Sequence, residues 1–254
     1  MKAWLGVLGL LAFGGVLEAL PRLGLVPAGY LPPPSRIAVA LADQAHQPTF
    51  WAALGDTLRT WLTGLAIAVA AGLVCGVVIG SVPLLREATA STVEFLRPIP
   101  SVALIPLAVL LYGTGIRATL LLVVYAAFWQ VLVQVLHGVG DVDPVARDTA
   151  DSYRLGRLAR MRYLVWPTAL PYALTGVRLA TSVALVLAVT GELVIGTPGL
   201  GREIAVAQSS GAVPAMYALV VVTGLLGVAA NLLTRTAERR VLRWHPAIRS
   251  EAPA

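Results

Sequence analysis

Long apolar runs separated by short, arginine-bearing segments dominate this sequence. About 20 mostly apolar residues are needed to cross the roughly 30 Å of hydrocarbon in a bilayer. A chain inside the bilayer must also satisfy its own backbone hydrogen bonds, which only helices and closed barrels achieve. The pattern therefore predicts an all-α, polytopic membrane protein that forms a single domain over residues 1–254.

The composition supports a membrane protein and argues against several soluble functions. Hydrophobic residues make up 57% of the chain and charged residues 13%, whereas soluble domains have about 25% charged residues. The basic residues lie between apolar runs, as orientation in a membrane requires, and form no patch that would suit nucleic acid. Lys2 is the only lysine, and the sequence has no phosphate-binding G-x-x-x-x-G-K-[ST] loop.

Residues for catalysis or metal binding are also missing from the sequence. Cys75 is the only cysteine, and His46, His137 and His245 lack metal-ligand spacing. No serine, cysteine or histidine constellation suggests hydrolysis. We therefore expect a chain that is not an enzyme and holds no cofactor or metal, and whose work is powered by another subunit.

Six apolar runs are candidate membrane spans. They cover residues 4–20, 57–82, 102–112, 118–136, 172–195 and 213–234. The third run is short, so we extend it back through Pro98 and expect a kinked start. The first run has no clear cleavage site after it, which favours a retained helix over a signal peptide. The Pro-rich residues 21–51 read as an external loop or surface segment.

Glycines and arginines predict how these spans pack and how they are oriented. Gly64, Gly72, Gly76 and Gly80 share one helical face, where neighbouring helices can approach closely. Thirteen Lys and Arg residues fall in the segments assigned to the cytoplasm and five in those assigned to the outside. The positive-inside rule then places both termini in the cytoplasm.

The longest polar segment, residues 138–171, is predicted to contain a short helix. Its arginines are Arg147, Arg154, Arg157, Arg160 and Arg162. Asp143 can cap a helix that Pro144 begins, and Gly156 is placed to end it. A second helix is expected over residues 158–165, stopping before Pro167, with Pro171 beginning the next. Such a helix can serve as a mechanical handle for the attached spans; a solvated loop that only orients the protein is the alternative.

This segment resembles the "EAA" coupling loop in membrane subunits of bacterial ABC importers. Aligned on Trp166-Pro167, Asp148 takes the place of the family's glutamate and Ala150 that of its second alanine, while Arg154 replaces its glycine. Other segments are similar to the sulfonate, taurine and nitrate branch of the MetI-like, binding-protein-dependent permeases. They are L-R-P-I-P-S-V-A-L-I-P-L (96–107), A-L-P-Y-A-L-T-G-V-R (169–178), G-E-L-V-I-G-T-P-G-L-G (191–201) and L-R-W-H-P (242–246).

The resemblance implies a six-helix subunit of the bacterial cytoplasmic membrane that forms the pathway for a small anionic solute. It would pair with a second copy, sit on two cytoplasmic ATPase subunits that bind ATP and Mg, and receive solute from an extracytoplasmic binding protein. The implied coupling residues are Asp148, Ala150, Asp151, Tyr153, Arg154, Gly156 and Pro167.

Five further residues are candidates for the pathway or its gate. Glu192 is an ionisable group about 30 Å along the fifth span, near its outer end, although a merely interfacial position is the alternative. Gly199 and Gly201 lie in T-P-G-L-G, a re-entrant or plain external turn. Pro98 and Pro100 would leave carbonyl groups free to line a cavity.

The remaining charged features have simpler interpretations. Arg178, near the cytoplasmic end of the fifth span, is expected to snorkel to lipid headgroups or to brace the loop. The basic cytoplasmic tail covers residues 235–254, and its first part, residues 235–244, is expected to form an amphipathic helix on anionic lipid. A self-contained secondary transporter or channel is the competing function, but it would need inverted repeats and buried acidic residues. A membrane scaffold without transport is a third possibility.

Overall fold

The structure, a computed structural model, describes residues 3–27 and 29–243, all of whose regular elements are helical. The elements are α1 (Ala3–Arg22), α2 (Pro34–Ala45), α3 (Pro48–Ser81), α4 (Pro83–Leu96), the 3₁₀ helix η1 (Ser101–Leu104), α5 (Ile105–Tyr112), α6 (Ile116–Gly140), α7 (Pro144–Ser152), α8 (Arg157–Arg160), the π-helix η2 (Met161–Val165), α9 (Trp166–Ile195), α10 (Leu200–Ser209) and α11 (Val213–Val241).

Five of these segments are long and apolar enough to span a membrane, and a bent pair brings the number to six. The single segments are α1, α3, α6, α11 and the continuous helical stretch from α8 through α9. In the bent pair, α4 meets η1 and α5 at 84°, after the turn that contains Pro98 and Pro100. The kink expected at Pro98 is therefore present, and it is sharp enough for a broken span or a re-entrant loop.

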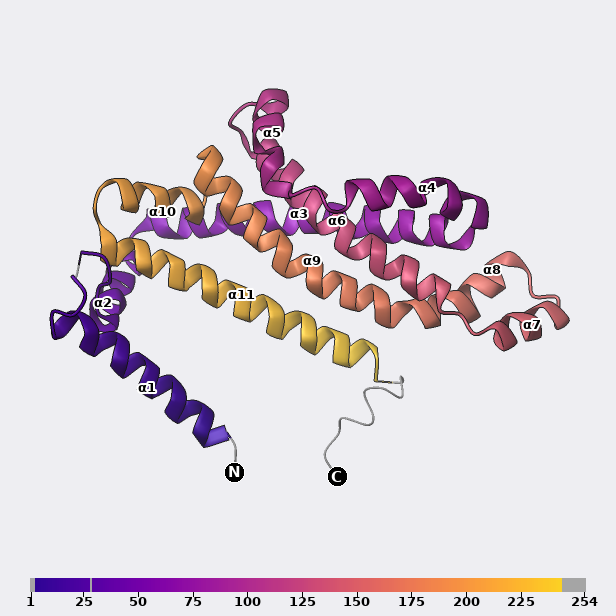
Figure 1. The fold of residues 1–254 in the computed structure, drawn as a ribbon, viewed down its shortest axis with the longest axis horizontal. Helices are drawn as coiled ribbons and strands as arrows, with labels where there is room; N and C mark the ends of the chain where they lie inside the picture. Colours follow the sequence, from indigo (N-terminus) through magenta and orange to yellow (C-terminus); the bar gives the residue numbers. More distant parts are fainter. Residues whose placement is uncertain (1–2, 28, 244–254) are drawn as a thin grey trace.

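The core of the bundle is α6, which packs against α3 on one side and α9 on the other (Figure 1). The small residues of α3 let α6 approach. A Cβ added to Gly72 would lie 2.7 Å from Cβ of Val131, and one added to Gly76 would lie 2.7 Å from Cβ of Val135. The glycine face predicted for this span is thus the α3–α6 contact.

The bundle has two distinct ends, which we call the α7 end and the α10 end (Figure 1). At the α7 end, the chain leaves α6, forms α7 and α8, and returns into α9. At the α10 end, the chain turns from α9 into α10 and then α11, close to α2. Both α7 and α10 lie beside the long helices and not among the six spans, so each is a candidate contact for a partner.

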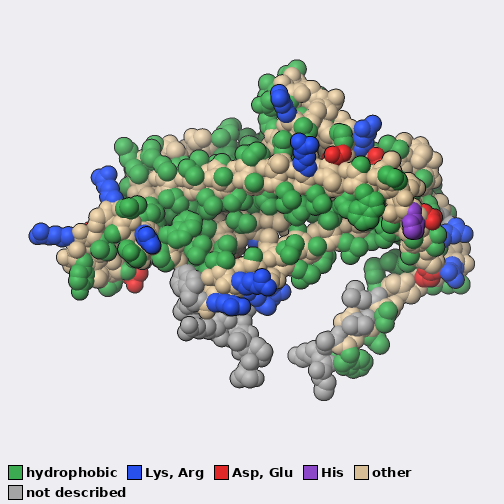
Figure 2. All heavy atoms as spheres, turned by 180° about the vertical axis from the view of Figure 1, so that it is seen from behind, with side chains coloured by type: hydrophobic (Ala, Val, Ile, Leu, Met, Phe, Trp, Pro, Cys, Tyr) green, Lys and Arg blue, Asp and Glu red, His purple; other side chains and the backbone are tan. Residues whose placement is uncertain are grey.

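The surface of the long helices is mostly apolar on the face shown in Figure 2, and the arginines gather near the ends of elements. Leu110 is 82% exposed and Leu233 70% exposed. Exposed side chains of this kind are unfavourable in water but suit lipid or a second membrane chain. The distribution agrees with a protein that crosses a bilayer.

Several boundaries differ from the sequence-based expectation. Residues 21–51 are not simply a loop, because they include all of α2 and the beginning of α3. The second loop helix does not stop before Pro167: it continues through η2 into α9, and Pro171 lies inside α9. The last span runs on to Val241, so the described part of the basic tail prolongs α11; residues 244–254 lie outside the described residues.

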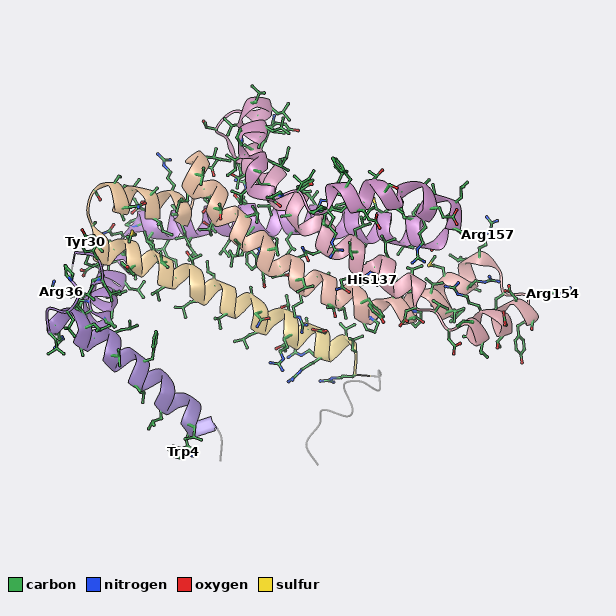
Figure 3. The ribbon with its side chains drawn as sticks, in the orientation of Figure 1. Trp4, Tyr30, Arg36, His137, Arg154 and Arg157 are labelled. Atoms are coloured by element: carbon green, nitrogen blue, oxygen red, sulfur yellow. The ribbon has the colours of Figure 1, made fainter. Side chains whose placement is uncertain are left out.

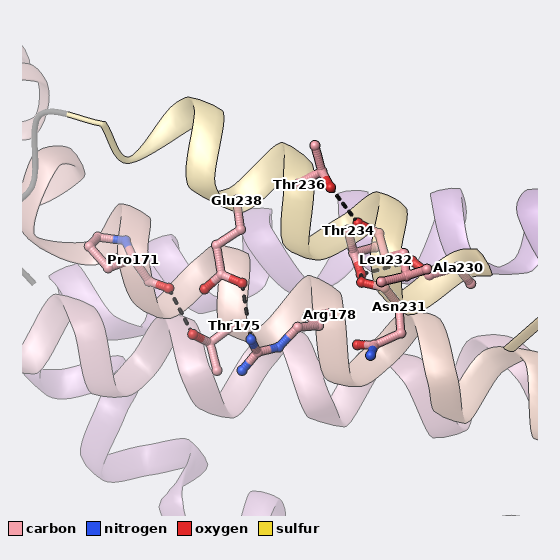
Figure 4. Close-up of polar contacts among 9 residues, drawn as sticks. All are labelled: Pro171, Thr175, Arg178, Ala230, Asn231, Leu232, Thr234, Thr236 and Glu238. Atoms are coloured by element: carbon pink, nitrogen blue, oxygen red, sulfur yellow. Dashed lines mark hydrogen bonds and ion pairs between the residues drawn. The ribbon is translucent and has the colours of Figure 1, made fainter. Parts of the chain in front are cut away.

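Arg178 does not brace the loop. Its Nη1 lies 3.2 Å from Oε2 of Glu238, which joins α9 to α11 (Figure 4). Nearby, the Thr175 hydroxyl donates to the carbonyl of Pro171 at 3.1 Å. The ion pair fixes the last turns of α11 against α9 near the α7 end.

Candidate functional site

Glu192 is a fully buried carboxylate at the α10 end of α9. The hydroxyl of Thr57, on α3, donates to Oε2 of Glu192 at 2.8 Å, and the backbone N–H of Gly201, on α10, donates to the same oxygen at 3.0 Å. The other oxygen, Oε1, has no hydrogen-bond partner among the described residues. One carboxylate thus connects the consecutive helices α9 and α10 to α3, which lies 135 residues away in the sequence.

Thr57 makes a second contact that closes this network. Its hydroxyl oxygen accepts a hydrogen bond from the N–H of Leu200 at 2.8 Å. Leu200 is the first residue of α10, where backbone N–H groups lack helical partners and favour negative charge. The Thr57 hydroxyl and the Glu192 carboxylate therefore accept hydrogen bonds from the first backbone N–H groups of α10, which are buried inside the protein.

Two glycines are required by the close approach of the turn to Glu192. Gly199 has φ +149°, and a Cβ there would collide with the Glu192 carboxylate. At Gly201, an added Cβ would lie 2.7 Å from Cβ of Glu192. The structure therefore brings together Glu192, Gly199 and Gly201, the three candidates from this part of the sequence.

The turn before α10 is also fastened to α6. The hydroxyls of Thr197 and Thr119 lie 3.0 Å apart, and both side chains are buried. The segment expected to be an external turn thus packs against α3, α6 and α9. Thr57, Thr119 and Thr197 were not singled out from the sequence, because single threonines are ordinary in apolar helices and each pair is at least 78 residues apart.

The second candidate site is α7 with the turn that follows it. Oδ1 of Asp143 accepts from the N–H of Val145 at 2.8 Å, which confirms the predicted cap. The helix ends at Ser152, and Arg154 follows with φ +50°. The left-handed position is therefore Arg154, where the aligned family motif has glycine, and not Gly156, which directly precedes α8 and has φ −62°.

The coupling candidates differ in accessibility. Ala150 is 5% exposed and faces the protein, whereas Tyr153 is 79% exposed. Asp148 and Asp151 are exposed, and Asp151 forms an ion pair with Arg160 of α8. The accessible surface of this segment is therefore acidic and aromatic near Tyr153, with Arg154 at its tip (Figure 3).

Pro167 and the two prolines of the bend lie apart from these clusters. Pro167 is the second residue of α9, directly after the π-helix η2. Pro98 and Pro100 are exposed in the segment between α4 and η1. The hydroxyl of Tyr125, on α6, donates to the Leu96 carbonyl at 2.6 Å, which fixes this bend to the core.

Comparison with known proteins identifies the family. Residues 68–243 match the family described as "Binding-protein-dependent transport system inner membrane component". The taurine transport system permease protein TauC of Escherichia coli (strain K12) is 30% identical over 228 residues, which cover 88% of this chain and 83% of TauC. The putative aliphatic sulfonates transport permease protein SsuC of Bacillus subtilis (strain 168) is 24% identical over 229 residues, 90% of this chain and 83% of SsuC.

The fold leads to the same family. A crystal structure of an amino acid ABC transporter superposes with a TM-score of 0.66 at 21% identity, covering 79% of this chain and 97% of that chain. This likeness concerns the fold alone. Together with the sequence match, it shows that the chain belongs to the binding-protein-dependent transport system inner membrane components and is a multi-pass permease subunit of an ABC importer.

Proposed function

We propose that this permease forms the pathway for a small anionic solute of the sulfonate, taurine or nitrate kind, and that α7 receives the motion of a cytoplasmic ATPase. The substrate class follows the relatives, which transport taurine and, by their description, aliphatic sulfonates. A substrate-binding protein would deliver the solute at the α10 end. Both termini would then be cytoplasmic, because α11 ends toward α7 and the arginine count favours that side.

The coupling proposal rests on the unbroken helical stretch that starts just after the α7 segment and contains Glu192. From Arg157 to Ile195 the chain is one helical stretch of 39 residues. It begins directly after the exposed turn at Tyr153 and Arg154. A displacement of α7 is therefore transmitted along α9 for about 50 Å, at about 1.5 Å per residue, to the buried junction at Glu192.

The Glu192 junction suits a gate because it joins α3, α9 and α10 through a few polar contacts. Rotation of α9 would move the carboxylate away from the Thr57 hydroxyl and the N–H of Gly201, which it meets at 2.8 and 3.0 Å. These two hydrogen bonds are either formed or broken, and a transporter that alternates between two conformations needs contacts of this kind. Pro98 and Pro100 would shape the pathway at the bend between α4 and α5.

A homodimer is the assembly that we propose for the permease. In the bent pair, α5 projects from the bundle while α4 lies along α3 (Figure 1), and both carry exposed apolar side chains, including Phe95 (72% exposed) and Leu110 (82% exposed). A second copy packed there would cover this surface. Two copies would also present two α7 segments to two ATPase subunits.

The coupling role is tested by Tyr153→Asp. Tyr153 is a better probe than Ala150, because a charge at the buried Ala150 would disturb the loop itself. We expect Tyr153→Asp to abolish ATP-driven uptake and to reduce the amount of ATPase that copurifies, while the permease remains in the membrane. Tyr30→Asp, at an equally exposed tyrosine (77%) near the α10 end, is the control and should keep its ATPase. Normal uptake by Tyr153→Asp would refute the coupling role.

A further inference from the structure

A cavity of about 800 Å³ lies at the α7 end, between the end of α3, the end of α6 and the α7–α8 segment. We call it the arginine pocket. Four arginines line it: Arg86, Arg147, Arg157 and Arg160. No carboxylate is among the described residues that line it. Asp151 pairs with Arg160 from outside the lining, and the other three arginines leave an excess of positive charge that favours an anion.

The arginines are only partly satisfied by the protein. Arg160 pairs with Asp151 through Nη2, but its buried Nε has no hydrogen-bond partner in the described part of the chain. Arg147 donates to the carbonyl of Val139 at 3.3 Å. Arg86 and Arg157 form none of the ion pairs found among residues 3–27 and 29–243. Several donors therefore remain for a ligand with oxygen acceptors.

Arg86 and Arg157 bring positive charge to the pocket from two different elements, α4 and α8. A Cβ added to Gly140, the last residue of α6, would lie 3.3 Å from both Nη1 and Nη2 of Arg86. Figure 3 shows Arg157 directed from α8 toward the turn between α3 and α4. Planar guanidinium groups arranged around one space are suited to binding phosphate oxygens.

A second cavity, of about 460 Å³, continues from the first along the membrane-facing side of α3. We call it the apolar groove. Val74 and Val78 form one wall, and Leu158 and Trp166 form the other. Met161 lines both cavities. Val74 is 64% and Val78 50% exposed, so none of residues 3–27 and 29–243 covers the groove.

We propose that the two cavities together bind an anionic phospholipid, with the phosphate headgroup in the arginine pocket and an acyl chain in the apolar groove. A free anion would use the pocket but not the groove. The pocket lies where three long helices reach one end of the bundle, the expected depth of headgroups, and basic pockets between spans at the cytoplasmic side suit them. The lipid would join α3, α4 and α8 and so steady the segment from which α9 begins.

The test uses the permease assembled with its ATPase in nanodiscs of equal parts phosphatidylcholine and phosphatidylglycerol. After extraction in mild detergent, the lipid retained per protein is measured by mass spectrometry. We expect the unmodified complex to retain phosphatidylglycerol in preference to phosphatidylcholine. The double variant Arg86→Gln/Arg157→Gln should lose this preference by about tenfold or more.

Two further variants make the result specific. Arg36→Gln/Arg202→Gln removes the same charge from two exposed arginines on α2 and α10 and should retain phosphatidylglycerol as the unmodified complex does. Val78→Trp fills the groove, keeps every arginine and should also expel the lipid, which tests the site even if the arginine variant fails to fold. Equal retention by all variants would overturn the proposal, as would complete displacement by inorganic phosphate, which would show a site for free anions.

Discussion

At the residue scale, Thr57 shows how much of the α10 end depends on one hydroxyl group. It donates to Glu192 and accepts from the N–H of Leu200, both at 2.8 Å and both buried. Without it, the N–H and one carboxylate oxygen each lose a hydrogen bond inside the protein. A buried polar group left without a partner costs about 1–3 kcal/mol.

We therefore predict that Thr57→Val lowers the free energy of unfolding by about 1–3 kcal/mol and impairs uptake. Thr57→Ser keeps the hydroxyl and should behave nearly as the unmodified protein. Thermal unfolding of the purified complex measures the first effect, with Thr63→Val, which removes an exposed hydroxyl on the same helix, as a control. Equal stability of the valine and serine variants would show that the network contributes little.

Arg154 presents a different problem, because its backbone has φ +50° without being glycine. The left-handed conformation costs an L-residue about 1–2 kcal/mol, and glycine is the usual residue where a helix ends in this way. Two properties of Arg154 must be separated: its side chain carries a positive charge, and its backbone conformation is strained.

Arg154→Gly should raise the stability of the α7 segment by about 1 kcal/mol, seen as slower hydrogen exchange in α7. Arg154→Ala removes the charge but keeps the strained conformation. If the charge contacts the ATPase, both variants lose uptake; if only the turn matters, Arg154→Gly keeps uptake. We predict the second outcome, because the aligned family motif has glycine at this position. Loss of uptake in Arg154→Gly would contradict that prediction.

At the scale of elements, the α3–α6 pair is the rigid part of the bundle. Its glycines place the two backbones so close that a methyl group would clash with Val131 or Val135. Packing against small residues is a principal source of helix association in membranes. In the coupling mechanism proposed above, α7 and α10 would move relative to this pair.

Gly72→Ala is accordingly expected to destabilise the protein by about 1–3 kcal/mol, the typical cost of overpacking. Gly55→Ala, on the same helix but with no atom within 4 Å of the added Cβ, should be neutral or stabilising by up to about 1 kcal/mol. The unfolding temperatures of the two variants test this. The same loss at both positions would mean that helix propensity, and not the contact with α6, determines the effect.

The helix that begins after Arg154 shows why boundaries are harder to predict than spans. Pro167 suggested the end of one helix and Pro171 the start of the next, because proline interrupts an α-helix. In the structure the π-helix η2 precedes Pro167, and the helix continues through both prolines. The local pattern indicated a break, whereas burial of Ala169 and Ala173 against the bundle favours one helix.

At the scale of the whole molecule, the membrane fold and the family could be predicted from the sequence. Apolar run length determined the spans, and the glycine spacing on α3 determined one packing face. The short helices α2 and α10 were missed, because 12 and 10 residues are too few for a span. The residues of α2 were assigned to an external loop or surface segment, and the first residues of α10 to a turn. The partners of Glu192 were also missed, since contacts 135 residues apart leave no local signal.

ATP dependence of transport in proteoliposomes tests the central claim most directly. The complex of this permease with its ATPase is reconstituted, binding protein and labelled solute are added outside, and uptake is followed with and without ATP inside. Uptake that requires ATP and the ATPase subunit, and that disappears with Tyr153→Asp, is the predicted result. Uptake by the permease alone, without ATP, would contradict the account and favour a secondary transporter or channel.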